Sequence, residues 1–255
     1  MAKKRSILVT NDDGVSSPGI RALVEVAREF GEVKVVAPDS PQSGKGHSIT
    51  LDGILRMQPV DLFDGVEAYK CSGTPTDCVK LAVNKVFDDK PDFCFSGINH
   101  GSNEAINVIY SGTMAAAMEA SFLDIKSIGF SHLNYRHGTD MLAAQKFAAK
   151  IIQMSIEKGF PASNLLNVNF PDLPESEIKG VKICRQANAS WDEEFDERES
   201  PFGRKYYWLT GKFVNTDLDE EADTIALKNG YVSVVPVQRD LTSYSDMKKL
   251  KDSWN

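Results

Sequence analysis

Residues 7–14 read Ile-Leu-Val-Thr-Asn-Asp-Asp-Gly, an apolar run that ends at two adjacent carboxylates. The aliphatic residues are typical of a short buried strand, and Asn11 and Gly14 are turn formers that end it. Asp12 and Asp13 are therefore expected at the carboxyl end of the strand, the edge where an open α/β sheet binds its ligands. Adjacent carboxylates repel each other unless a cation or solvent compensates them, and oxygen donors favour hard ions such as Mg²⁺ or Mn²⁺. The motif predicts either a metal site or a solvated helix-capping turn.

The segment after this motif predicts a βαβ unit. Ser17 and Pro18 mark the start of a helix, and apolar residues then recur at helical spacing until Gly31. Residues 33–37 form the next strand, which Pro38 closes. Because such units cross over in the right-handed sense, the sheet is expected to begin as a parallel sheet.

The alternation of strands and helices continues to about residue 171 and predicts a mixed α/β core. Helices are expected over residues 75–87, 113–123 and 139–157, and strands over residues 92–95, 127–130 and 165–169. Residues 48–71 hold strand-like pieces such as residues 54–57 but no helix, which predicts a hairpin at the edge of the sheet. Towards the end of the chain we expect a short helix near 221–229, a strand over 231–235 and a polar helix ending at Trp254.

The alternation of predicted strands and helices stops after Pro171, where charged residues become frequent. Residues 172–220 are predicted to leave the core, with residues 206–209 and 212–214 as hairpin strands and the acidic run 193–197 in solvent. We predict one α/β domain over residues 1–255, with its core in residues 1–171 and 221–240. Exposed aromatic side chains on an excursion usually pack against another subunit. Residues 172–220 and the C-terminal helix, residues 241–255, are therefore expected to serve in oligomerisation.

Composition excludes several classes of protein. The chain has 255 residues, of which 42% are hydrophobic and 25% charged, and its formal net charge is −7. This balance does not fit a disordered chain, a membrane protein or a cationic surface for duplex nucleic acid. The basic start is followed by too short an apolar stretch for a signal peptide, so a cytoplasmic protein is expected.

Three further polar segments follow predicted strands or open a predicted helix. Residues 41–46 and 96–103 each follow a strand, so Ser43 and Asn99 are expected at the same sheet edge as the two carboxylates. Residues 110–113 open a helix, where backbone N–H groups and hydroxyls can bind a phosphate. Taken singly, each segment is more often an ordinary turn or helix cap.

Taken together, these segments resemble the SurE survival-protein family of metal-dependent 5'-nucleotidases. The resemblance rests on Thr10-Asn11-Asp12-Asp13-Gly14, Ala37-Pro38-Asp39 with Ser43-Gly44 and Ile49-Thr50, Gly73-Thr74-Pro75-Thr76-Asp77-Cys78-Val79, Ser96-Gly97-Ile98-Asn99 with Gly101 and Asn103, Tyr110-Ser111-Gly112-Thr113, Val232-Ser233-Val234 with Pro236, and Gln238, Asp240, Leu241 and Thr242. These blocks span nearly the whole chain in the order that the family has them.

The resemblance implies a fold and a set of site residues. The implied fold is a Rossmann-like, three-layer α/β structure whose mostly parallel sheet carries a β-hairpin excursion and a C-terminal extension. The implied cofactor is one divalent ion per subunit, Mg²⁺ or Mn²⁺, held by Asp12, Asp13, Ser43 and Asn99. Phosphate contacts are implied for Asn103, Ser111, Gly112 and Thr113, and the catalytic role is implied for Asp12 and Asp13.

The implied activity is the hydrolysis of nucleoside 5'-monophosphates to nucleoside and phosphate, with water as the nucleophile. Nucleoside 3'-monophosphates and short polyphosphate are further substrates within the family. The resemblance also implies a homodimer or homotetramer that exchanges C-terminal segments.

Two other functions fit parts of the sequence. Haloacid-dehalogenase phosphatases also place Asp-x-Asp-Gly after an apolar strand, but alignment of Asp13-Gly14 with that motif puts Asn11 at the nucleophile position. An amide is a poor nucleophile towards phosphorus, so the covalent route is disfavoured. A non-catalytic, metal-dependent nucleotide-binding stress module would use the same site. His47 and His100 lie in the site segments without the spacing of a zinc pair, and their role stays open.

Overall fold

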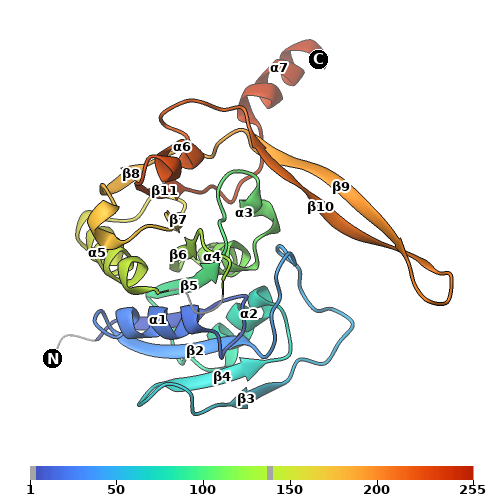
Figure 1. Ribbon diagram of the computed structural model, residues 1–255. Helices are drawn as coiled ribbons and strands as arrows, with labels where there is room; N and C mark the ends of the chain where they lie inside the picture. The colour runs from blue at the N-terminus through green and yellow to red at the C-terminus, as the bar shows by residue number, and fades with distance from the viewer. Residues whose placement is uncertain (1–3, 137–139, 255) are drawn as a thin grey trace.

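The structure, a computed structural model, describes residues 4–136 and 140–254 and has three layers (Figure 1). Within these residues the main sheet has the strand order β3-β4-β2-β1-β5-β6-β7-β11-β8. Its strands are β1 (Ser6–Thr10), β2 (Glu32–Pro38), β3 (Met57–Pro59), β4 (Glu67–Cys71), β5 (Phe93–His100), β6 (Lys126–His132), β7 (Leu165–Phe170), β8 (Val181–Ile183) and β11 (Val232–Pro236). A separate hairpin consists of β9 (Ala189–Glu199) and β10 (Lys205–Asn215).

The described residues form seven α-helices, four of which cover the two faces of the main sheet. They are α1 (Pro18–Ala27), α2 (Pro75–Lys85), α3 (Asn107–Tyr110), α4 (Gly112–Phe122), α5 (Leu142–Lys158), α6 (Asp223–Lys228) and α7 (Tyr244–Trp254), and a 3₁₀ turn spans Glu175–Glu177. Helices α1 and α5 contribute to one apolar cluster, and α2 and α4 contribute to a cluster on the other face. Figure 1 shows the sheet between these two pairs of helices.

Strand β1 lies in the middle of the sheet and is buried on both faces. Ile7 and Val9 belong to the cluster under α1 and α5, whereas Leu8 belongs to the cluster under α2 and α4. This alternation follows from the two-residue period of a strand. Strand β1 is parallel to β2 and to β5, and Thr10 pairs with Ser96. The carboxyl ends of β1 and β5 therefore lie side by side.

The predicted fold class is confirmed. Among the main-sheet pairs, β3 with β4 and β7 with β11 are antiparallel, and the other pairs are parallel. The predicted edge hairpin is formed by β3 and β4, although residues 54–56 precede the first strand, which begins at Met57. Helix α5 begins at Leu142, and residue 139, where the sequence predicts its start, lies outside the described residues.

The prediction that residues 96–103 form a loop is partly wrong, because β5 extends to His100. The pairing of β5 with β6 shifts its register between Ser96 and Asn99, and Asn99 then pairs with Ser131. The polar residues at the end of this strand resemble a loop in sequence, but all of them are buried. Asn99 is therefore held by the sheet rather than by a loop.

The predicted hairpin is present, but its two predicted strand segments are parts of a single strand. Residues 206–209 and 212–214 belong to one strand, β10, and its partner β9 contains the acidic run 193–197. Gly211 lies between these two segments, within β10 and opposite Glu193. Nearly every residue of β9 is exposed, so β9 lacks the apolar alternation that identifies a half-buried strand.

The predicted excursion, residues 172–220, is too long. Strand β8 lies within it but pairs with β11 in the main sheet, so the segment that leaves the core is the β9–β10 hairpin. Figure 1 shows this hairpin projecting away from the layers, with α7 also separate from them. Among the residues that the structure describes, no helix is both long and apolar enough to cross a bilayer.

Candidate active site at the carboxyl ends of β1 and β5

The turn after β1 is closed by Asn11. Its side-chain amide donates to the carbonyl oxygen of Gly14 over 3.0 Å and to the hydroxyl of Ser17 over 2.8 Å. Gly14 adopts a positive φ of 97°, which a glycine reaches without steric cost. Because Asn11 provides the turn contacts, the two following carboxylates remain available for other partners.

The first carboxylate, Asp12, lies against the start of α4. The Thr113 hydroxyl donates to Asp12 Oδ1, and Asp12 is 3% exposed. A Cβ added to Gly112 would lie 2.7 Å from Asp12 Cβ, so a residue with a side chain would be too close at this position. Ser111 caps the helix by accepting a hydrogen bond from the Met114 N–H over 3.0 Å. The predicted phosphate turn therefore lies beside the predicted metal carboxylate.

The second carboxylate, Asp13, is bound by His100 at the end of β5. The backbone N–H of His100 donates to Asp13 Oδ2 over 3.1 Å, and the ring Nδ1 lies 3.0 Å from the same oxygen. These two contacts fix one oxygen of the carboxylate. The role of His100 could not be predicted from the sequence, because its partner lies 87 positions away in the chain.

The segment that carries Ser43 is attached to both of the other site segments. The Gln42 N–H donates to the carbonyl oxygen of Asp12 over 2.8 Å, and the Gly46 N–H donates to the carbonyl oxygen of Tyr110 over 3.0 Å. Ser43 lies between these contacts and is exposed. His47, in the same segment, contacts α4 instead. Its Nε2 lies 2.9 Å from Glu119 Oε2, and its ring stacks on the ring of Phe122.

The two predicted asparagines take part in different hydrogen bonds. The Asn99 side-chain amide donates to the carbonyl oxygen of Gly101 over 2.8 Å. The Asn103 side chain donates to the Ser131 hydroxyl over 2.7 Å, and its backbone N–H donates to Asn169 Oδ1 over 2.8 Å. The structure thus places Asn103 in a buried polar network with β6 and β7.

Sequence reasoning missed two members of this network on β7. Asn167 donates to the carbonyl oxygen of Asn103 over 2.8 Å, and Asn169 donates to Asn167 Oδ1 over 3.0 Å. Both side chains are buried, and a buried amide must find partners to avoid a large desolvation cost. The available signal was two asparagines, two positions apart, in an otherwise apolar strand.

The electrostatics of the two carboxylates favour a cation. Burial, and after it the neighbouring charge of Asp13, raise the pKa of Asp12 to about 6, against the hydrogen bond from Thr113. The Asn11 Oδ1 and Thr10 Oγ1 atoms are buried without a hydrogen-bond partner in the described structure. An ion that neutralises the two carboxylates would remove the repulsion that raises the pKa of Asp12.

The donor set fits a hard divalent ion. Among the described residues, no group of three or more His, Cys, Asp and Glu side chains is arranged to hold a metal. A metal here would therefore need neutral oxygens beside the two carboxylates, and Ser43 and Asn99 can provide a hydroxyl and an amide oxygen. Such an all-oxygen set suits Mg²⁺ and Mn²⁺ better than Zn²⁺.

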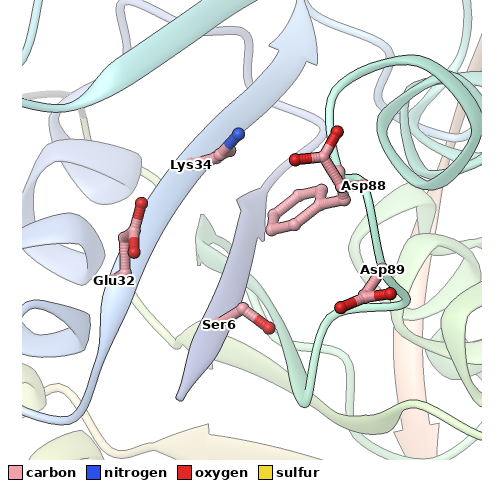
Figure 2. A pocket seen from close by; sticks show the side chains of 6 residues that line it. Ser6, Glu32, Lys34, Asp88 and Asp89 are labelled. Atoms are coloured by element: carbon pink, nitrogen blue, oxygen red, sulfur yellow. The ribbon is translucent and has the colours of Figure 1, made fainter. Parts of the chain in front are cut away.

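A cavity at the opposite end of the sheet is less suited to this chemistry. Ser6 and Glu32, the first residues of β1 and β2, line this cavity together with Asp88 and Asp89 (Figure 2). The cavity has a volume of about 160 Å³, and Lys34 in its lining already pairs with Glu67 over 2.8 Å. Ligands of open α/β sheets bind at the carboxyl ends of the strands, not at this end.

Comparison with known proteins agrees with the sequence resemblance. The family model described as survival protein SurE matches residues 7–193. A 5'-nucleotidase SurE from Christiangramia forsetii is 56% identical over 255 residues, covering 99% of this chain and 98% of that protein. A 5'-nucleotidase SurE from Flavobacterium psychrophilum is 54% identical over 253 residues, covering 99% and 98%.

A solved structure resembles the whole fold. The crystal structure of the SurE protein from Aquifex aeolicus superposes with a TM-score of 0.84 and 38% sequence identity. The match covers 98% of this chain and 100% of that one. Because the family model, full-length relatives and a full-length structure all agree, the chain belongs to the SurE family.

Proposed function

We propose that this chain is a divalent-metal-dependent 5'-nucleotidase that hydrolyses nucleoside 5'-monophosphates to nucleoside and phosphate. The relatives that are more than half identical over nearly their full length bear the name 5'-nucleotidase. The observation that carries the proposal is the contact between the start of α4 and Asp12, through Gly112 and Thr113. This contact supports the proposal, because a helix start is suited to bind phosphate and adjacent carboxylates are suited to bind a metal.

Each site residue has a proposed part in the reaction. Asp12, Asp13, Ser43 and Asn99 would hold the ion. A bound Mg²⁺ or Mn²⁺ would supply Lewis-acid chemistry towards the phosphate ester and water. The N–H groups at the start of α4 would bind the phosphate oxygens and stabilise their charge, as would Ser111 and Thr113.

Asn103 is proposed to have two roles: it orders the segment that follows β5, and it donates a hydrogen bond to the phosphate. Its hydrogen bonds to Ser131, Asn167 and Asn169 order the segment that follows β5. The free hydrogen of its amide group can then donate to a phosphate oxygen. We therefore expect Asn103→Ala to weaken both the binding of phosphate and the order of this segment.

The covalent route of haloacid dehalogenases is not part of the proposal. Asn11 occupies the position of their nucleophile, and its side-chain amide is engaged by Gly14 and Ser17. A neutral amide is a far weaker nucleophile towards phosphorus than the carboxylate that this route needs. The absence of acid-stable phosphate on the protein after incubation with substrate is the expected result.

Phosphate release from a panel of substrates tests the proposal. The panel contains ribonucleoside and deoxyribonucleoside 5'- and 3'-monophosphates, short polyphosphate and an aryl phosphate, each with EDTA, Mg²⁺ or Mn²⁺. Repeated turnover of 5'-monophosphates that requires a metal supports the proposal. Stoichiometric nucleotide binding without phosphate release, under every ion, would instead support a non-catalytic stress module.

We further propose that the chain assembles as a homodimer or homotetramer through the β9–β10 hairpin and α7. Helix α7 has no buried residue, and its apolar side chains include Met247, Leu250 and Trp254. Helices in globular proteins bury such residues against another element. Light scattering should show that the full chain is an oligomer and that the chain without residues 241–255 forms a smaller species. A full chain that is monomeric at micromolar concentration would contradict this proposal.

A further inference from the structure

We propose that a cavity between the Ser43 segment, α3 and the hairpin is the subsite for the nucleobase. The cavity has a volume of about 510 Å³. Its lining includes Gly44, Tyr110, Trp191, Glu193, Leu209 and Gly211. This inference rests on the proposed nucleotidase function, which assigns a phosphate site but not a site for the rest of the nucleotide.

The position of the cavity follows from the chain. Gly44 comes directly after the proposed metal ligand Ser43, and Tyr110 comes directly before Ser111 in the proposed phosphate turn. The hydrogen bond from the Gly46 N–H to the carbonyl oxygen of Tyr110 holds these two segments together. A nucleotide whose phosphate lies at the start of α4 can therefore extend along them into the cavity.

The walls of the cavity suit a flat, apolar ring. Tyr110, Trp191 and Leu209 remain partly exposed, by 53%, 41% and 63%. Aromatic side chains of this kind stack on nucleobases with little preference for sequence, because every base has a π face. Gly44 leaves room for the ring, because no atom lies within 4 Å of a Cβ built on it.

The ring of Trp191 is already fixed in place. Its Nε1–H donates to Asn107 Oδ1 on α3 over 2.8 Å, and its ring meets Phe213 edge to face, with centroids 5.6 Å apart. These contacts connect the hairpin to the short helix that precedes the phosphate turn. A side chain held in this way loses little freedom when a ligand stacks on it.

The charge of the cavity favours a base over a second phosphate. Its lining contains the carboxylate of Glu193 and no Lys or Arg. A carboxylate repels phosphate but accepts hydrogen bonds from the N–H groups of a base. The cavity therefore fits the neutral end of a nucleoside monophosphate.

The test compares AMP with ribose 5-phosphate, which lacks the base. Trp191→Ala should lower the ratio of kcat/KM for AMP to kcat/KM for ribose 5-phosphate by about ten-fold or more. Trp191→Phe should restore most of this ratio. The matched control is Trp208→Ala, which removes a tryptophan of the same hairpin that does not line the cavity.

Calorimetric binding of adenosine separates the two proposals. If the wild type binds adenosine and Trp191→Ala does not, the base subsite stands even where no phosphate is released. If the wild type hydrolyses AMP but Trp191→Ala changes both substrates equally, or neither, the nucleotidase stands and the base subsite is refuted. A Trp208→Ala variant that lowers the substrate ratio as much as Trp191→Ala would also refute it.

Discussion

The hydroxyl of Thr113 donates to the carboxylate of Asp12 across 101 positions of sequence. One residue lies at the start of α4 and the other follows β1, so this contact joins the proposed phosphate turn to the proposed metal site. Gly112 permits it, because a side chain at that position would collide with Asp12. The chemistry that we propose depends on this close approach.

Replacement of Asp13 by Asn should abolish AMP hydrolysis and leave the fold intact. The change removes one of two charges that bind the ion but keeps the shape of the side chain and its contact with His100. Phosphate release and circular dichroism give the two readouts. Asp88→Asn, at the opposite end of the sheet, is the control and should keep full activity. Asp13→Asn turnover within a few-fold of wild type would contradict the metal assignment.

Thr113→Val should weaken metal binding and turnover about ten-fold or more. Valine has nearly the same shape as threonine but cannot donate to Asp12, and a hydrogen bond to a charged group contributes roughly 1.5–3 kcal/mol. The metal concentration that gives half-maximal activity is the direct readout. Thr113→Ser keeps the hydroxyl and should restore most of the activity. A valine variant with unchanged metal dependence would show that the hydrogen bond has no part in binding the ion.

Gly112→Ala should lower both activity and stability, although alanine is the better helix former. Its Cβ would lie 3.0 Å from Asp12 Oδ2, and such overpacking costs typically about 1–3 kcal/mol. Thermal unfolding and phosphate release measure the two effects. Ala115→Gly, in the next turn of α4, is the control: it should reduce stability by its helix propensity and spare activity. A Gly112→Ala variant that is as active as wild type would show that α4 can move away from Asp12.

Glu104→Gln should stabilise the protein at neutral pH. Burial raises the pKa of Glu104, and the nearby charge of Asp223 also raises it, against the hydrogen bond from Ser102. The folded protein therefore binds this proton more tightly than the unfolded chain, and stability falls as pH rises through the raised pKa. Glutamine has no proton to lose, so its advantage over wild type should be larger near about pH 7 than near about pH 4.

Urea unfolding of both proteins at the two pH values measures this advantage. Glu29→Gln, on an exposed position after α1, makes the same chemical change outside the core and is the control. An advantage for Glu104→Gln that does not change with pH would mean that the ionisation of Glu104 does not differ between the folded and unfolded states.

Local sequence signals were enough to predict the centre of the fold. The apolar run before Asp12, the proline at Pro18 and the turn former Gly14 specify a strand, a turn and a helix within a short stretch. The carboxyl ends of parallel strands must then meet at one sheet edge. For this reason the sequence could indicate which segments come together before any contact was known.

Features that depend on distant partners could not be predicted in this way. The contact of His100 with Asp13 and the network of Asn103 with Asn167 and Asn169 join segments far apart in the chain. No periodicity marks such contacts. Strand β9 was missed for a different reason, because both of its faces are exposed and its residues show no apolar alternation.

The most direct test of the central claim is a titration of AMP hydrolysis with Mn²⁺ for the wild type and for Asp13→Asn, starting from protein treated with EDTA. The account predicts no phosphate release before the metal is added, saturable recovery for the wild type and none for the variant. Full activity of the wild type in EDTA, or equal recovery of both proteins, would contradict the proposal that Asp12 and Asp13 hold a metal needed for the reaction.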